Sequence, residues 1–167
     1  IKPATASYTI HVTDSSSPVT EDTYVKVTSA SDLVAGSKYI LVYEDGPKVF
    51  KPTLNGSNFT TTGNALDVII TDGTIVSDDF KDCQLTLEDG YYFYVESVSR
   101  YLYPTYNNMG AEETKSSSHS FSISISSGTS TISRTSNNTT YNLRYSTSSS
   151  YFQSSTSSAN VALYKLE

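Results

Sequence analysis

Hydrophobic residues in this chain alternate with polar residues over short segments, and such a period of two is typical of β-strands. β-branched and aromatic residues occupy most of the apolar positions. The segments with this pattern are 8–12, 24–27, 39–43, 66–70, 85–87, 91–95, 121–125 and 161–164. Short strands without intervening helices predict an all-β protein.

Turn-forming dipeptides separate these segments. Asn-Gly and Asp-Gly pairs tolerate the positive φ angles of tight hairpins, and Ser-Gly has a glycine at the same place. They occur at Asp45-Gly46, Asn55-Gly56, Asp72-Gly73, Asp89-Gly90 and Ser127-Gly128. The only helical signal lies within residues 28–36, where Ser29 or Ser31 caps a single turn that ends at Gly36.

Three aromatic-rich hairpins suggest an internal repeat. They cover residues 39–52, 92–104 and 131–145, each follows another strand, and segment 161–164 closes the series. Lobes of roughly 40–50 residues that cover one another's apolar faces would close a barrel and remove free strand edges. We therefore expect a β-trefoil-like barrel of three unequal lobes, with a β-sandwich as the alternative.

The first 18 residues differ from the rest of the chain. One alternating strand, within residues 6–14, precedes the linker-like sequence Ser15-Ser16-Ser17-Pro18. We interpret residues 1–18 as the last strand of a preceding domain plus a linker, and residues 19–167 as the main module. The alternative is an edge strand of the main module itself. The sequence shows no signal-peptide pattern at Ile1, and we expect that such a peptide was removed or lies upstream in a longer parent protein.

Charge excludes some partners. Charged residues make up 17% of the chain, the net charge is −6, and the basic residues are scattered singly. Nucleic-acid binding depends on clustered Lys and Arg, so we expect no nucleic-acid partner. No run of about 18 apolar residues exists to span a membrane. Cys83 is the only cysteine, and we interpret it as a small buried hydrophobic residue inside the strand pattern of residues 83–87.

Several segments carry a resemblance to known modules. Residues 6–13, Ala-Ser-Tyr-Thr-Ile-His-Val-Thr, resemble the terminal strand of a bacterial Ig-like (Big) domain. The rest is similar to an uncharacterised all-β module of secreted and surface proteins of Bacteroidetes gut bacteria, which lies beside Ig-like domains, nucleases or other hydrolases. The segments that carry this second resemblance are 27–33, 36–42, 141–145, 151–152 and 161–165.

This resemblance spans nearly the whole chain and implies an extracellular or cell-surface location. It supplies no catalytic residues. Family members often have a basic or aromatic pair near the position of Tyr151-Phe152-Gln153, whereas serines flank these residues here.

Catalytic patterns are absent from the sequence. A Ser/His/Asp triad would have to use His119, but no Gly-x-Ser-x-Gly motif accompanies it. The adjacent carboxylates Glu44-Asp45, Asp78-Asp79 and Glu112-Glu113 would point to opposite faces of a strand, whereas a glycosidase needs two carboxyls facing one cleft. We expect no enzyme activity and no cofactor.

A metal site is also not expected. Asp78, Asp79 and Asp82, near Asp72, offer oxygen ligands for Ca²⁺, but their spacing matches no EF-hand loop. We interpret them as an acidic surface loop.

Tyrosine is the most informative residue type, with 14 copies and no Trp in the chain. Six of them lie between positions 91 and 106, and strand alternation must turn some outward. A Tyr face stacks on the C–H surface of a sugar, while amides bond its hydroxyls. We predict a shallow ligand site formed by Tyr103, Tyr106, Asn107 and Asn108.

These observations favour a non-catalytic extracellular module that binds carbohydrate. One alternative is a spacer or adhesion domain that contacts a host or bacterial surface protein and has all these rings buried. A hydrolase, the third hypothesis, would need His119 within hydrogen-bond reach of a Ser and a carboxylate.

Overall fold

The computed structural model describes residues 20–106 and 108–167. The expectations for residues 1–18 and for Asn107 therefore lie outside the described residues. Within those ranges no helix has the length and apolarity needed to cross a bilayer.

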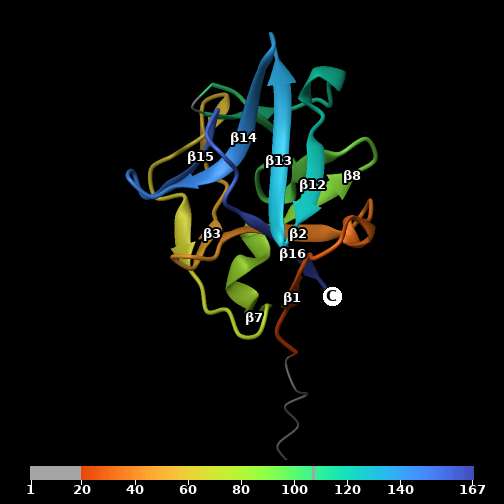
Figure 1. The fold of residues 1–167 in the computed structure, drawn as a ribbon, viewed down its shortest axis with the longest axis vertical. Coiled ribbons are helices and arrows are strands. Elements are labelled where there is room, and N and C mark those ends of the chain that lie inside the picture. Colours follow the sequence, from red (N-terminus) through yellow and green to blue (C-terminus); the bar gives the residue numbers. More distant parts are fainter. Residues whose placement is uncertain (1–19, 107) are drawn as a thin grey trace, which may run out of the picture.

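The described chain consists of strands and short 3-10 helices (Figure 1). The strands are β1 (Thr23–Lys26), β2 (Lys38–Tyr43), β3 (Lys48–Phe50), β4 (Leu54–Asn55), β5 (Asn58–Phe59), β6 (Ala65–Asp67), β7 (Thr74–Val76), β8 (Leu85–Glu88), β9 (Tyr92–Val95), β10 (Arg100–Pro104), β11 (Met109–Glu112), β12 (Ser122–Ser126), β13 (Thr129–Ser136), β14 (Thr139–Ser146), β15 (Tyr151–Ser155) and β16 (Ala162–Leu166). The helices are η1 (Ala30–Asp32), η2 (Asp78–Cys83), η3 (Glu96–Val98) and η4 (Ser117–His119).

The strands form two antiparallel sheets. The larger has 12 strands, with the main order β4-β5-β11-β10-β9-β8-β2-β16-β1-β7, and the smaller has the order β12-β13-β14-β15. Ser130 joins them, because its N–H donates to the Val161 carbonyl at 2.8 Å and its Oγ accepts from the Leu163 N–H at 3.0 Å. The all-β prediction is confirmed. Both described sheets are open and their arrangement is sandwich-like, so closure into a trefoil-like barrel is not confirmed.

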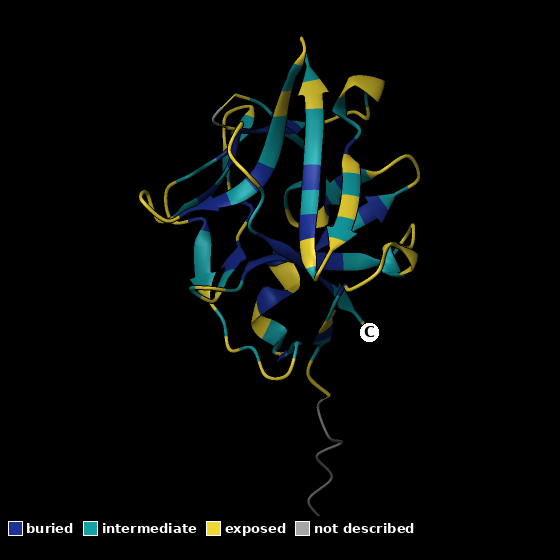
Figure 2. Ribbon diagram, in the orientation of Figure 1, coloured by how far each residue is buried: buried dark blue, intermediate teal, exposed yellow. Residues whose placement is uncertain are grey.

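The main core lies between the two sheets. Leu41 and Phe93 of the larger sheet share one buried cluster with Leu143 and Phe152 of the smaller sheet. Figure 2 shows the buried segments concentrated where the strands of the two sheets approach each other. A second cluster lies on the other face of β2 and β16 and includes Phe80 of η2. Successive strand residues point to opposite faces, so β2 is buried on both sides.

Local sequence signals account for the hairpins. Asp72 and Gly73 have φ angles of 49° and 73°, and Ser127 and Gly128 have 50° and 77°. Positive φ at both central residues is what a tight two-residue hairpin turn requires. Ser29 caps η1, and Asp32 completes a capping box. The predicted hairpin turns and the Ser29 cap are confirmed, but the helical turn ends at Asp32, with Leu33 as its C-cap, and not at Gly36.

Two local predictions differ from the structure. Segment 66–70 is a strand only as far as Asp67, because β6 pairs with β3 and the chain then turns away. Cys83 is buried as expected, but it ends η2 rather than lying in a strand. Burial raises the pKa of its thiol to about 12, so the thiol remains protonated at neutral pH.

Candidate functional site

Tyr103 is held tightly within the protein. It lies opposite Gly110 in the β10–β11 pair, and a Cβ atom added to Gly110 would stand 2.2 Å from the Tyr103 Cζ and 2.5 and 2.6 Å from the neighbouring Cε atoms. These nearly equal distances place Gly110 against a face of the ring rather than its edge. His119 stacks on the ring with 3.9 Å between centroids and an interplanar angle of 12°. Gly110 and His119 cannot share one face without overlapping, so both faces of Tyr103 are covered and neither is open to a sugar.

Tyr106, three residues later, is the exposed member of the predicted set. Tyr106 is 69% exposed. The preceding Thr105 donates from its N–H and its hydroxyl to the Asn108 carbonyl, at 3.0 and 3.1 Å, and these bonds close the turn that presents the ring. Tyr141 of β14 meets the ring edge to face, with 6.3 Å between centroids and an angle of 79°. Asn108 is exposed beside this turn.

Arg134 of β13 connects these tyrosines. It lies opposite Tyr141 in the β13–β14 register, and its Nη1 donates to the Pro104 carbonyl at 3.0 Å. Its Nε donates to the Ser118 carbonyl in η4. The guanidinium carbon lies 5.7 Å from the centre of the Tyr103 ring. Arg134 thus ties the end of β10 to η4 at the rim of the smaller sheet.

We call Thr105, Tyr106, Asn108, Arg134 and Tyr141 the Tyr106 surface. Its chemistry combines an exposed ring, an amide and a cation. Such a surface can bind a polar ligand that has an apolar face. The sequence indicated Tyr106 and Asn108, but Arg134 and Tyr141 come from a different sheet. A sequence-based prediction that paired β13 with β14 in the observed register would have placed Arg134 beside Tyr141.

His119 supports this surface from behind. Burial lowers the pKa of its imidazole, the nearby Arg134 lowers it further, and Glu112 acts in the opposite direction. Its Nδ1 is buried without a hydrogen-bond partner. Among the described residues, no hydrogen bond joins its side chain to a serine or a carboxylate, so the geometry of a hydrolytic triad is not assembled there.

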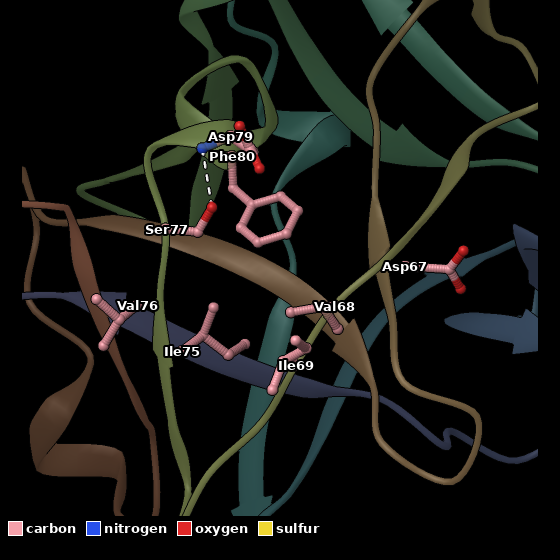
Figure 3. A pocket seen from close by; sticks show the side chains of 8 residues that line it. All are labelled: Asp67, Val68, Ile69, Ile75, Val76, Ser77, Asp79 and Phe80. Carbon is pink, nitrogen blue, oxygen red and sulfur yellow. Dashed lines mark hydrogen bonds between the residues drawn. The ribbon is translucent and has the colours of Figure 1, made fainter.

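A second candidate site lies between β6 and β7 (Figure 3). Thr71 and Thr74 exchange two backbone hydrogen bonds of 2.9 Å across the Asp72-Gly73 turn, and beyond them the two arms of the hairpin separate. A hollow of about 320 Å³ lies between the arms. Its lining consists of Asp67, Val68, Ile69, Ile75, Val76, Ser77, Asp79 and Phe80, and we call it the β6–β7 wedge.

The wedge combines apolar side chains with backbone groups that have no partner among residues 20–106 and 108–167. Ile69 is 84% exposed and Val76 is 54% exposed, which is unusual for large aliphatic residues. The Ser77 N–H donates to the Asp22 carbonyl at 3.0 Å and the Lys26 N–H donates to the Gly73 carbonyl at 2.9 Å. Odd-numbered residues along β7 therefore direct their backbone groups toward β1, and those of Val76 point away from it. The wedge can therefore accept an extended polypeptide segment. The alternating pattern of residues 66–70 predicted a continuous strand through Ile69, and for that reason the sequence analysis did not indicate this site.

The acidic residues considered as Ca²⁺ ligands contact other protein groups or line separate hollows. Asp78 lies 3.0 Å from the Lys81 amine and accepts from the Asp22 N–H at 3.1 Å. Both contacts lower the pKa of the Asp78 carboxyl, with Lys81 the larger cause. Asp79 lines the wedge, whereas Asp82 lines a separate open hollow with Lys38 and Gln84. In the described ranges, no group of three or more His, Cys, Asp or Glu side chains is arranged to hold a metal ion.

Comparisons with protein-family models, with curated proteins and with solved structures found no match to this chain.

Proposed function

We propose that this chain is a non-catalytic module of a multidomain bacterial surface protein and that its Tyr106 surface binds carbohydrate. The observation that carries the proposal is the 69% exposure of Tyr106 on a turn closed by two hydrogen bonds. The ring is therefore available to a ligand. The resemblance to Bacteroidetes surface modules is the basis for the extracellular location.

Stacking on a preformed ring suits a sugar. Tyr141 restrains Tyr106 through its edge-to-face contact, so less side-chain entropy is lost when a ligand binds. Asn108 and Thr105 place polar groups beside the ring, where sugar hydroxyls would lie. The exposed position of the Tyr106 ring predicts weak binding to one sugar and stronger binding to a repeating chain.

The test is a screen of host, bacterial and dietary glycans with the 167-residue chain. Tyr106→Ala should abolish binding with little change in melting temperature, and Tyr106→Phe should retain most of it because the ring remains. Tyr91→Ala is the matched control, since Tyr91 is 44% exposed and lies outside the Tyr106 surface. Binding that survives Tyr106→Ala would reject this site, and absence of binding across the screen would reject the function.

Protein adhesion is the second candidate function, and the β6–β7 wedge favours it. The partner would be an extended polypeptide segment with apolar side chains at alternate positions. Ile69 and Val76 would contact those side chains, and the backbone groups of Val76 that point away from β1 would bond the segment.

This second candidate can be tested with a displayed library of random peptides. Selected peptides should show apolar residues at every second position and should lose binding to Ile69→Lys. Tyr106→Ala serves as the control because it leaves the wedge unchanged. Peptides that bind Ile69→Lys as well as the wild type would exclude the wedge as their site.

A further inference from the structure

Arg134 differs from most cations of this protein in having no carboxylate partner. Six other basic side chains pair with Asp or Glu within the described residues: Lys26, Lys38, Lys48, Lys81, Arg100 and Lys115. Arg134 instead donates to two neutral carbonyl oxygens, those of Ser118 and Pro104. Its positive charge is therefore not neutralised by an ion pair in the described part of the chain.

The two carbonyl contacts also fix where the guanidinium lies. They use one N–H of Nε and one of Nη1, so three of the five N–H donors of an Arg remain. Nη2 forms no hydrogen bond within the described residues. The buried polar atoms that lack a partner there do not include Nη2, so this nitrogen reaches solvent. A cation held in place with free donors is prepared to bind an anion at little entropic cost.

The contacts of Arg134 place its charge near the exposed ring of Tyr106. Arg134 is the cross-strand partner of Tyr141, which contacts Tyr106, and it bonds Pro104 two residues before Tyr106. Glu112, the carboxylate beside Tyr103, accepts a hydrogen bond from the Tyr103 hydroxyl at 3.2 Å and forms no ion pair with Arg134 in the described part of the chain. An anion and an aromatic-stacking group could thus be recognised together at one surface.

We propose that the carbohydrate bound at the Tyr106 surface is an acidic one, in which a carboxylate or sulfate group bonds Arg134 while the sugar ring stacks on Tyr106. This inference rests on the proposed carbohydrate-binding function and specifies its ligand class. The whole chain carries a net charge of −6, which repels polyanions in general. A preference for acidic glycans must therefore come from a local contact, and Arg134 supplies it.

The experiment compares two polymers that differ only in charge: polygalacturonate, and the same polymer after reduction of its carboxyl groups to alcohols. Binding to each is measured for the wild type and for Arg134→Gln at several salt concentrations. The wild type should bind the acidic polymer about tenfold more tightly or better, as expected for a charge-assisted hydrogen bond. This preference should shrink as salt increases.

Arg134→Gln should reduce the preference to about twofold or less while binding of the neutral polymer persists, which shows that the site is still folded. Arg134→Lys should restore part of the preference because the charge returns without the planar fork. Arg144→Gln is the matched control: Arg144 also has no ion pair among the described residues, and alternation along β14 turns it away from the face of Leu143.

The possible results separate the two proposals. Equal wild-type binding of both polymers would overturn the acidic-ligand inference and leave carbohydrate binding intact. A preference that survives Arg134→Gln would also overturn it, because the charge would then come from elsewhere. Binding of neither polymer, together with a negative glycan screen, would reject the carbohydrate function itself.

Discussion

The Tyr106 surface and the β6–β7 wedge expose hydrophobic side chains in two different ways. At the Tyr106 surface the exposed ring is braced by Tyr141, and the covered ring of Tyr103 lies behind it between Gly110 and His119. In the wedge the exposed residue is Ile69, on an arm that has left its sheet. The first surface therefore suits a ligand that stacks and bonds, whereas the second suits a chain that completes a sheet.

The comparison also shows that neighbouring residues of the same type have different roles. Tyr103 and Tyr106 are three positions apart, yet Tyr106 is 69% exposed whereas Gly110 and His119 cover the two faces of the Tyr103 ring. Ile75 and Ile69 line the same hollow, yet Ile75 is 1% exposed. Substitutions within each pair can separate folding from binding.

The largest expected difference in stability is between alanine variants of Tyr103 and Tyr106. Tyr103→Ala should lower the free energy of unfolding by about 3–4 kcal/mol, because it removes a covered ring, its stack on His119 and its bond to Glu112. Tyr106→Ala should change the same quantity by about 0.5 kcal/mol or less. Urea unfolding followed by circular dichroism measures both. Similar losses for the two variants would mean that Tyr106 is also part of the folded core.

Substitutions of Ile75 and Ile69 should also differ in their effect on the free energy of unfolding, by somewhat less than those of the two tyrosines. Ile75→Ala should destabilise the protein by about 2–3 kcal/mol, because Ile75 is packed in the cluster that includes Phe80. Ile69→Ala should remain within about 0.5 kcal/mol of the wild type, since its side chain loses little contact with protein. The same unfolding assay applies. A large loss for Ile69→Ala would show that the wedge is occupied in solution.

Gly110 tests the packing behind the Tyr106 surface. Gly110→Ala places a methyl group 2.2 Å from the Tyr103 Cζ, so the ring must move. We expect a loss of about 1–2 kcal/mol, as for overpacking elsewhere, together with altered ring-current shifts of His119. NMR spectra of the His119 ring protons provide the measurement. Unchanged shifts would contradict the stacking of His119 on Tyr103.

Much of the fold follows from local sequence. The hairpin turns at Asp72-Gly73 and Ser127-Gly128, the cap at Ser29 and the burial of Cys83 all depend on residues close in sequence, and the structure agrees with each. The strand expected to reach Ile70 ends at Asp67, because β6 and β7 pair with different strands. Such pairing is a tertiary preference that alternation along one segment does not encode.

The candidate site was less predictable for the same reason. Alternation indicates that some tyrosines face outward, but the register opposite Gly110 is what covers Tyr103. Arg134 and Tyr141 reach the Tyr106 surface from another sheet, and no spacing within residues 91–106 points to them. Alternation therefore indicated exposed rings in this segment without separating Tyr106 from Tyr103, and the supporting residues required the three-dimensional pairing of two sheets.

The smallest expected effect concerns pH. The pKa of His119 is lowered in the folded protein, first by burial and then by Arg134, relative to about 6.5 in an unfolded chain. The unfolded state therefore takes up a proton more readily. Stability from this residue is complete above pH 6.5 and decreases as the pH falls through the unfolded pKa toward the lowered folded one.

Melting temperatures between pH 7.5 and 5.0 test this prediction. The wild type should lose stability over that interval, and His119→Gln should lose less because the titrating group is gone. The paired carboxyls of Asp78 and Glu96 have lowered pKa values, so their protonation affects stability mainly below this interval. Parallel curves for the wild type and His119→Gln would show that the imidazole behind the Tyr106 surface can be protonated without disturbing its stack on Tyr103.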